Sequence, residues 1–139
     1  MAVAYKHAQS SVKRWGGQEE DYLPIHEFMD SSKAAFPSNQ HRAAFHHSFG
    51  CSVIIPAVFG DRITNSDGRT IPTKDIAELH VLEDHQMKFI PSLQDWFEHI
   101  PWAGWMDNGR GGVPPSAKKI AEHRVASQQE GKVVNYTVD

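Results

Sequence analysis

Apolar residues recur every three to four positions through the first part of the chain, which is the spacing of amphipathic α-helices. The first such segment, residues 3–14, ends at the glycine pair 16–17, because glycine readily takes the left-handed conformation of a helix stop. The second, residues 21–36, tolerates Pro24 in its first turn, where no helical hydrogen bond is lost. The pattern therefore predicts two consecutive helices, with Asp21 as the cap of the second.

Two further helices are predicted in the middle of the chain. Residues 40–59 form the third apolar pattern, which Pro56 should kink or interrupt because it lacks a backbone donor and clashes with the preceding turn. Residues 74–89 form the fourth pattern, and Asp75 in its first turn suits the helix dipole. Both patterns are expected to present an apolar face to the core.

A different pattern separates these two helices. Residues 61–72 carry two short β-prone runs on either side of a turn that contains Asp67 and Gly68, which is a β-hairpin signal. After the fourth helix, Ser92 can cap a short helix over residues 93–100. The chain is therefore expected to be mostly α: a single small helical domain of roughly four or five helices with a short β-hairpin insertion.

The composition changes after the last cluster of aromatic residues. Residues 108–115 are rich in glycine and proline, which is typical of a linker. We therefore expect a helical domain in residues 1–106, followed by a Gly/Pro linker and C-terminal tail in residues 107–139. Within the tail, residues 117–129 can form a charged helix, and residues 133–138 have β character.

The composition also argues against several classes of protein. The formal net charge of −3 gives no electrostatic reason to expect nucleic-acid binding. No apolar stretch approaches the ~20 residues of a membrane span, so no association with a membrane is expected. Cys51 is the single cysteine and cannot form an internal disulfide, which favours a cytoplasmic, intracellular setting and a packing role for the thiol.

Histidines gather on the third predicted helix. Three of the nine histidines of the chain fall within residues 41–47. At about 100° per residue, His47 lies near the middle of the apolar face of this helix, while His41 and His46 are turned away to opposite sides. His47 is therefore the imidazole expected to face the core.

On the fourth helix, a carboxylate occupies the centre of the apolar face. Glu83 lies at that centre, His80 flanks it, and Asp84 lies one step further round. A buried glutamate needs a partner, because an isolated buried charge costs several kcal/mol. His80 and Asp84 are four residues apart and can present two ligand atoms together.

Three hypotheses account for these side chains. The first is a buried His–Glu hydrogen-bond network that holds the two helices in register. The second is a shared divalent transition metal, with zinc expected first and iron, manganese or nickel also suited to mixed imidazole and carboxylate ligands. The third is metal-free acid–base catalysis. The candidate metal ligands are His41, His46, His47, His80, Glu83 and Asp84.

Other polar residues are expected to be structural. His7 is predicted to be solvated on the first helix, and His26 is predicted to pair with Asp30 on the surface of the second. The chain has no phosphate-binding glycine loop, Cys-x-x-Cys pair, nucleophile elbow or metalloprotease His-Glu-x-x-His sequence. The motifs therefore do not identify a reaction.

Several short segments are distinctive when taken together, and they lie at residues 22–28, 41–47, 64–69, 76–84 and 90–96. They resemble an uncharacterised domain-of-unknown-function family of bacterial and phage proteins. That family pairs a His-Arg-Ala-x-x-His-His helix with a His-x-x-Glu-Asp helix, and the resemblance spans about residues 5–106. It implies no known activity.

Two functions from different classes follow from these observations. The first is a metal-binding small helical domain, used as a metal-dependent hydrolase in which the ion lowers the pKa of a bound water. The second is a non-enzymatic, phage-type regulator or inhibitor that acts through protein–protein contacts, with the histidine cluster as a structural network. Those contacts would use the tail or the region of Trp96, Trp102 and Trp105. The substrate, the partner and the oligomeric state do not follow from the sequence.

Overall fold

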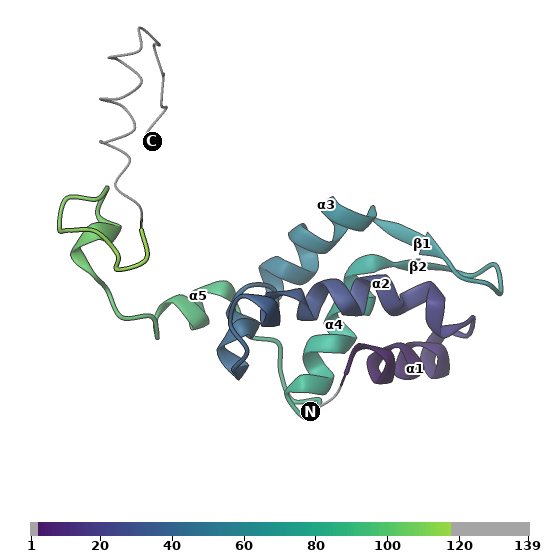
Figure 1. Cartoon of the computed structure of the whole chain (residues 1–139). Coiled ribbons are helices and arrows are strands. Elements are labelled where there is room, and N and C mark those ends of the chain that lie inside the picture. The colour runs from purple at the N-terminus through teal and green to yellow at the C-terminus, as the bar shows by residue number, and fades with distance from the viewer. Residues whose placement is uncertain (1–2, 118–139) are drawn as a thin grey trace, which may run out of the picture. The chain divides into compact units, whose positions relative to one another are not determined.

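The computed structural model describes residues 3–117 of the chain (Figure 1). The chain forms two units, the first ending at His99 and the second beginning at Ile100. The expected domain boundary after residue 106 stays a prediction, and the predicted tail elements lie outside the described residues, apart from Ala117. None of the helices in the described part has the length and apolar character needed to cross a membrane.

Two helices open the first unit, as predicted, and they pack side by side (Figure 1). The second ends at Asp30 and does not reach residue 36 as predicted. α1 (Ala4–Trp15) and α2 (Glu19–Asp30) are joined by the glycine pair, whose φ angles are 82° and 77°. The cap of α2 differs from the prediction, because Gln18 is the N-cap and Asp21 is the third residue of a capping box. Asp21 accepts the Gln18 backbone N–H at 2.8 Å and also two hydrogen bonds from Ser66, so it ties the helix start to the hairpin.

The prediction of a single third helix is wrong. A 3-10 helix, η2 (Asn39–Ala43), is followed by irregular backbone over residues 44–47 and only then by a longer helical stretch. That stretch contains a π-helix, η3 (Gly50–Ile54), and a short α-helix, α3 (Ile55–Phe59). The wide π turn lies directly before Pro56, which has no N–H to donate and whose ring needs more space than an α turn leaves.

Gly50 is expected to tolerate no side chain, because the backbone of Phe45 approaches it closely. A Cβ at Gly50 would overlap the Phe45 carbonyl oxygen. Gly50→Ala is therefore expected to destabilise the fold by roughly 3 kcal/mol, measured from the midpoint of urea unfolding. Gly68→Ala is the control, since it meets no atom within 4 Å and costs only about 1 kcal/mol of backbone strain. Equal losses in the two variants would contradict the close approach.

The hairpin prediction is confirmed. β1 (Arg62–Thr64) and β2 (Thr70–Pro72) pair in antiparallel fashion, with Ile63 opposite Ile71. Gly68 supplies the positive φ of the turn, 83°. Ile71 is buried in the core. The register of the two strands therefore turns the face that carries Ile71 toward the core, and this face anchors the hairpin.

α4 (Thr73–Asp84) follows the hairpin directly and is shorter than predicted. Its continuation to Phe89 is wrong, because Gln86 and Met87 have positive φ angles of 59° and 61°. The Met87 N–H bonds the Leu82 carbonyl at 2.7 Å and so closes the helix. His80, Glu83 and Asp84 therefore lie in the last turns of α4, close to a chain reversal.

Short helices complete the described chain. Ser92 caps α5 (Leu93–Phe97) as predicted, although this helix ends before Ile100. η1 (Ser31–Ala34) continues from the end of α2, and η4 (Gly104–Met106) lies in the second unit. The predicted fold class is confirmed, since the described chain is mostly α-helical with one short antiparallel hairpin.

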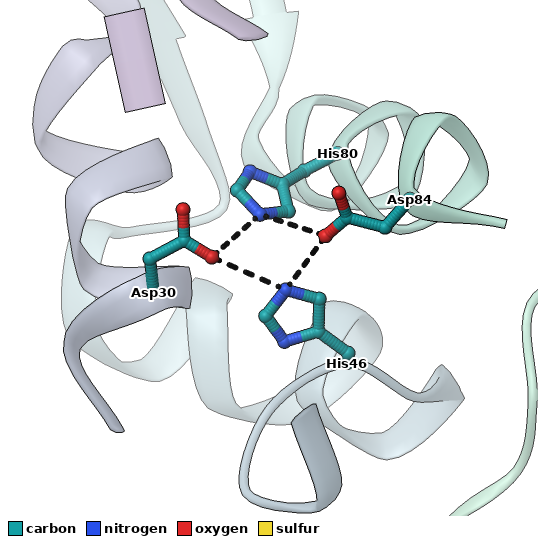
Figure 2. A group of neighbouring side chains, drawn as sticks. All are labelled: Asp30, His46, His80 and Asp84. Atoms are coloured by element: carbon teal, nitrogen blue, oxygen red, sulfur yellow. Dashed lines mark hydrogen bonds and ion pairs between the residues drawn. The ribbon is translucent and has the colours of Figure 1, made fainter. Parts of the chain in front are cut away.

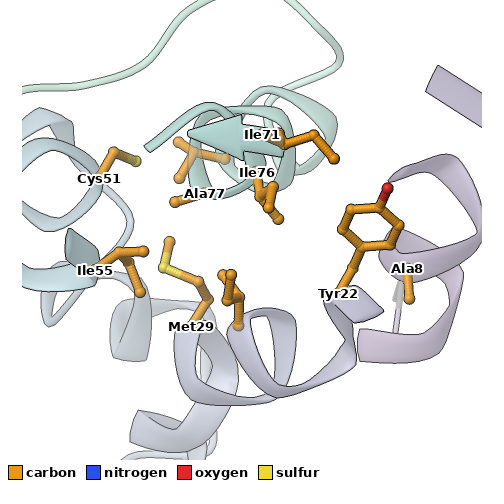
Figure 3. Packing of buried hydrophobic residues seen from close by; sticks show 10 residues of the cluster. Ala8, Tyr22, Met29, Cys51, Ile55, Ile71, Ile76 and Ala77 are labelled. Atoms are coloured by element: carbon orange, nitrogen blue, oxygen red, sulfur yellow. The ribbon is translucent and has the colours of Figure 1, made fainter. Parts of the chain in front are cut away.

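Apolar side chains from α1, α2, α4, β2 and the η3–α3 segment form the core of the first unit (Figure 3). Met29 of α2 points toward Cys51 and Ile55, and Tyr22 lies beside Ala8 of α1. Cys51 is fully buried in this core, which confirms its predicted packing role, and burial raises the pKa of its thiol to about 12.

Candidate metal centre

Four polar side chains from three separate segments meet inside the first unit (Figure 2). Asp30 is the last residue of α2, and His46 lies in the irregular segment 44–47. His80 and Asp84 lie one turn apart on α4. Each residue offers one ligand atom, and these atoms all lie within 4.8 Å of one another. We refer to these four residues as the His/Asp cluster.

The spacing within the His/Asp cluster resembles that of a metal coordination shell. The Nε2 atom of His46 is 3.4 Å from Asp30 and 3.1 Å from Asp84. The Nε2 atom of His80 is 3.2 Å and 3.5 Å from the same two carboxylates. A tetrahedral ion with bonds of ~2.0–2.2 Å holds its ligand atoms ~3.3–3.6 Å apart. The imidazole–carboxylate distances therefore fit a common ion with little movement.

Polar atoms without partners concentrate at this cluster. Within residues 3–117, six buried side-chain atoms have no hydrogen-bond partner, and all belong to the cluster or to its neighbours. Both ring nitrogens of His46 are among them, although its Nε2 lies close to two carboxylates. Each such atom costs about 1–3 kcal/mol, so their concentration points to a bound ion or water. The other four atoms are His7 Nε2, Asp30 Oδ2, His41 Nε2 and Arg42 Nε.

Both carboxylates of the cluster are ionised. Burial raises the pKa of Asp30, but the nearby rings of His46 and His80 outweigh burial and hold this pKa well below its ordinary value. Burial opposes ionisation of Asp84 in the same way, and His46 and His7 again lower the pKa further than burial raises it. Two negative charges therefore face one small buried volume, which favours a cation between them.

A chain of hydrogen bonds behind His80 couples the position of its ring hydrogen to those of His26 and Ser11. His80 Nδ1 lies 2.9 Å from His26 Nδ1, and His26 Nε2 lies 2.8 Å from the Ser11 hydroxyl. Mainly because of burial, the pKa of His26 is lowered to about 2 and that of His80 to about 4. Both rings are therefore neutral near neutral pH, and each carries a single N–H.

Two arrangements of hydrogens satisfy this chain. In the first, Ser11 donates to a backbone carbonyl of its own helix, His26 donates to Ser11, and His80 Nδ1 donates to His26. The lone pair of His80 Nε2 then faces the carboxylates, which is the state of a metal ligand. In the second, the hydrogens run the other way and His80 Nε2 donates to Asp30 at 3.2 Å. That state is a metal-free hydrogen-bond network.

The prediction that His7 is solvated is wrong, because only 2% of this residue is exposed. Its ring stacks on His80 with 3.8 Å between centroids, and its Nδ1 lies 2.9 Å from Glu83. Its Nε2 lies 3.4 Å from Asp84. Burial lowers the pKa of His7, but Asp84 and Glu83 outweigh burial and raise it to about 9. His7 is therefore a buried cation beside the cluster.

α4 is rotated by one residue relative to the prediction, so a different acid points to the cluster. The sequence places Glu83 at the centre of this face and Asp84 on its flank. In the structure the Asp84 side chain is 7% exposed and the Glu83 side chain 24%. Glu83 pairs with His7 beside the cluster, whereas Asp84 contributes an atom to it. Asp84, not Glu83, is the acid that the helix presents to the site.

The structure does not bring His41 and His47 into the four-residue cluster. His47 Nδ1 accepts the backbone N–H of Gly50 at 3.0 Å, so its Nε2 carries the hydrogen and donates to a backbone carbonyl at 3.1 Å. Both ring nitrogens of His47 thus form hydrogen bonds with nearby backbone groups. His41 donates from Nδ1 to the Ser38 carbonyl at 2.8 Å, and its Nε2 lies 3.8 Å from Asp30.

Sequence reasoning did not place Asp30 and His26 at this site. The prediction that they form a surface pair is wrong, because His26 is fully buried and bonds His80 and Ser11 instead. Asp30 faces the rings of His46 and His80. The two residues are four apart on α2, so both turn toward α4 and serve the same site.

The fold and the cluster together define a class of protein: a small helical domain with a buried group of two imidazoles and two carboxylates. The sequence profile of the domain of unknown function DUF6915 matches residues 2–106, which include the whole cluster. The chain therefore belongs to this family. No curated protein and no solved structure shows significant similarity to the chain. A bacterial or phage origin stays a prediction.

Proposed function

We propose that this domain binds one divalent transition metal through Asp30, His46, His80 and Asp84. One observation carries the proposal. Buried polar atoms without a hydrogen-bond partner are concentrated around four ligand atoms whose spacing resembles that of a coordination shell. Two imidazoles and two carboxylates suit zinc, and also manganese, iron or nickel. Zinc is the ion that we expect.

The surroundings of the ligands support this proposal. His26 lies 2.9 Å from the far nitrogen of His80, where it orients the ring. His7 and Arg42 lie 3.4 and 3.8 Å from the outer oxygen of Asp84. Outer partners of this kind fix the orientation of metal ligands and tune their basicity. The ion would therefore enter a site whose ligands are already held in place.

We further propose that the site performs metal-dependent hydrolysis. Four side chains fill a tetrahedral shell, so the water would bind as a fifth ligand, and a water bound to the ion loses a proton more readily than free water. His41 is suited to accept that proton, because its Nδ1 donates to a backbone carbonyl and its buried Nε2 has no partner. This Nε2 lies 3.8 Å from Asp30 Oδ1, one of the proposed ligand atoms, and so beside the proposed ion.

Elemental analysis of protein purified without an affinity tag is expected to find about one transition metal per chain. Asp84→Asn keeps the shape of the side chain but removes the charge that a metal ligand needs, so this variant is expected to lose the metal. Glu83→Gln is the matched control on the neighbouring residue. It disrupts the pair with His7 and leaves all four proposed ligands intact, so the metal should remain.

A wild-type protein that is free of metal, and whose melting temperature ignores both added zinc and chelator, would overturn the proposal. The metal-free hydrogen arrangement behind His80 would then be the better account of the cluster. Loss of metal from Glu83→Gln with retention in Asp84→Asn would place Glu83 in the coordination shell instead.

A further inference from the structure

We propose that the metal-loaded site binds a phosphate group. This inference rests on the proposed metal site and adds the chemical class of its ligand. Three side chains next to the His/Asp cluster carry it: the cations Lys33 and Arg42 and the imidazole of His41. None of the three supplies an atom to the cluster itself.

The charge balance around the cluster changes when an ion binds. Lys33 lies 3.7 Å from the outer oxygen of Asp30, and Arg42 lies 3.8 Å from the outer oxygen of Asp84. Without metal, these two carboxylates are the counter-ions of the two cations. A divalent ion neutralises both carboxylates, so Lys33 and Arg42 lose their negative partners. A dianion at the ion restores the balance, and half-buried charges favour such a partner.

Arg42 has free donors for this anion. Its Nε is buried without a hydrogen-bond partner, and its terminal nitrogen is too far from Asp84 for a direct hydrogen bond. A guanidinium carries its N–H groups in a fixed planar fork that matches two oxygens of a phosphate. The unused donors of Arg42 are thus of the kind that phosphate recognition requires.

His41 supplies an acceptor that distinguishes hydrogen phosphate from other anions. Its Nδ1 donates to the Ser38 carbonyl at 2.8 Å, so the neutral ring has its lone pair on Nε2. That nitrogen is buried in a side chain only 1% exposed and has no partner. The O–H of hydrogen phosphate can donate to it, whereas a carboxylate or a sulfate has no hydrogen to give. The same acceptor serves the proposed water when phosphate is absent.

The two cations are more exposed than the imidazoles of the cluster. His46 and His80 are fully buried. The exposed fraction of the side chain rises to 12% for Asp30, 18% for Arg42 and 26% for Lys33. Arg42 and Lys33 therefore place positive charge where solvent reaches the surroundings of the cluster. These residues belong to η2 and η1, which contact each other.

Calorimetric titration of the metal-loaded full chain with inorganic phosphate tests this inference, after excess metal has been removed. We expect about one phosphate per chain, and binding roughly tenfold or more weaker in Arg42→Gln when the variant and the wild type are compared at equal metal loading. Metal-free wild-type protein should not bind phosphate. Arg62→Gln removes an exposed arginine of β1 and is the matched control, which should bind like the wild type.

Two further ligands define the class of the anion. Acetate, a monoanion without a hydrogen to donate, is expected to bind at least roughly tenfold more weakly than phosphate. Methyl phosphate separates the two sources of a phosphate group. Its dianion has no hydrogen to donate to His41 Nε2, so we expect it to bind more weakly than inorganic phosphate, which assigns the site to the free ion. Equally tight binding would assign the site to a monoester and contradict the role of His41.

The outcomes separate this inference from the proposed function. Metal-loaded protein that ignores phosphate would overturn the inference and leave the metal site standing. Phosphate binding that is unchanged in both Arg42→Gln and Lys33→Gln would overturn it as well. Acetate binding as tight as phosphate would overturn the choice of phosphate. A protein that holds no metal would overturn both the inference and the function on which it rests.

Discussion

Replacing His46 with alanine is expected to remove the bound metal, whereas the same replacement of the adjacent His47 is expected to leave it in place. The two side chains are neighbours in the sequence but have different environments. His46 Nε2 lies between two carboxylates, 3.4 and 3.1 Å away. His47 has both ring nitrogens hydrogen-bonded to the backbone of its own loop. Metal content per chain, measured by elemental analysis, compares the two variants directly.

Thermal melting gives a second measure of the same difference. If zinc binds only the folded protein, zinc at about a hundred times its dissociation constant raises the free energy of unfolding by about 2.7 kcal/mol. For a chain of this size, that raises the melting temperature by roughly 10 °C. The wild type and His47→Ala should both show this rise, although His47→Ala starts from a lower melting temperature. His46→Ala should show none. Metal loss in His47→Ala alone would mean that residues 40–59 form the continuous helix that their apolar pattern predicts.

Local start and stop signals made the first helices and the hairpin predictable. The glycine pair 16–17 and the turn glycine of the hairpin take the positive φ that their positions require. The break in the third helix is different, because it depends on contacts with a distant segment. Ser48 donates to the Pro91 carbonyl at 2.8 Å, and the Trp96 indole donates to the His46 carbonyl at 3.3 Å. These bonds hold the backbone of residues 44–47 out of a helix, and no local pattern predicts them.

The sequence predicts the kind of site, a group of imidazoles and carboxylates, but only some of the residues that form it. The polar residues on the apolar helix faces indicate His80, but they favour Glu83 over Asp84. Buried histidines occupy part of the core-facing surface of α1, α2 and α4, so the apolar residues alone misplace the centre of the face. Polar residues four apart on one helix are the better signal, since α1, α2 and α4 contact one another. These pairs are His7 with Ser11, His26 with Asp30, and His80 with Asp84.

The metal-free protein is expected to lose stability steeply as the pH falls below about 6.5, the ordinary pKa of histidine. The pKa of His26 is lowered to about 2 and that of His80 to about 4, mainly by burial. Between pH 6.5 and 4, both rings are therefore neutral in the folded protein and protonated in the unfolded chain. Each such proton lowers the stability by about 1.4 kcal/mol per pH unit, so the pair contributes about 2.7 kcal/mol per unit.

His7 acts in the opposite direction. Its raised pKa of about 9 means that the folded protein keeps a proton that the unfolded chain releases above pH 6.5. The stabilisation from His7 is therefore fully present below pH 6.5 and is lost as the pH rises toward 9. Taken with His26 and His80, this places the maximum stability of the metal-free protein near pH 6.5.

His26→Gln separates the contribution of His26 from that of the rest of the cluster. Chemical unfolding in chelator over a series of pH values should show that this variant is less stable than the wild type near neutral pH. Its slope between pH 6 and 5 should be smaller by about 1.4 kcal/mol per unit, because one proton-accepting ring is gone. The exposed His99, replaced in the same way, is the control and should leave the slope as in the wild type. An unchanged slope in His26→Gln would mean that His26 already holds a proton in the folded protein, which the neutral chain from Ser11 to His80 does not allow.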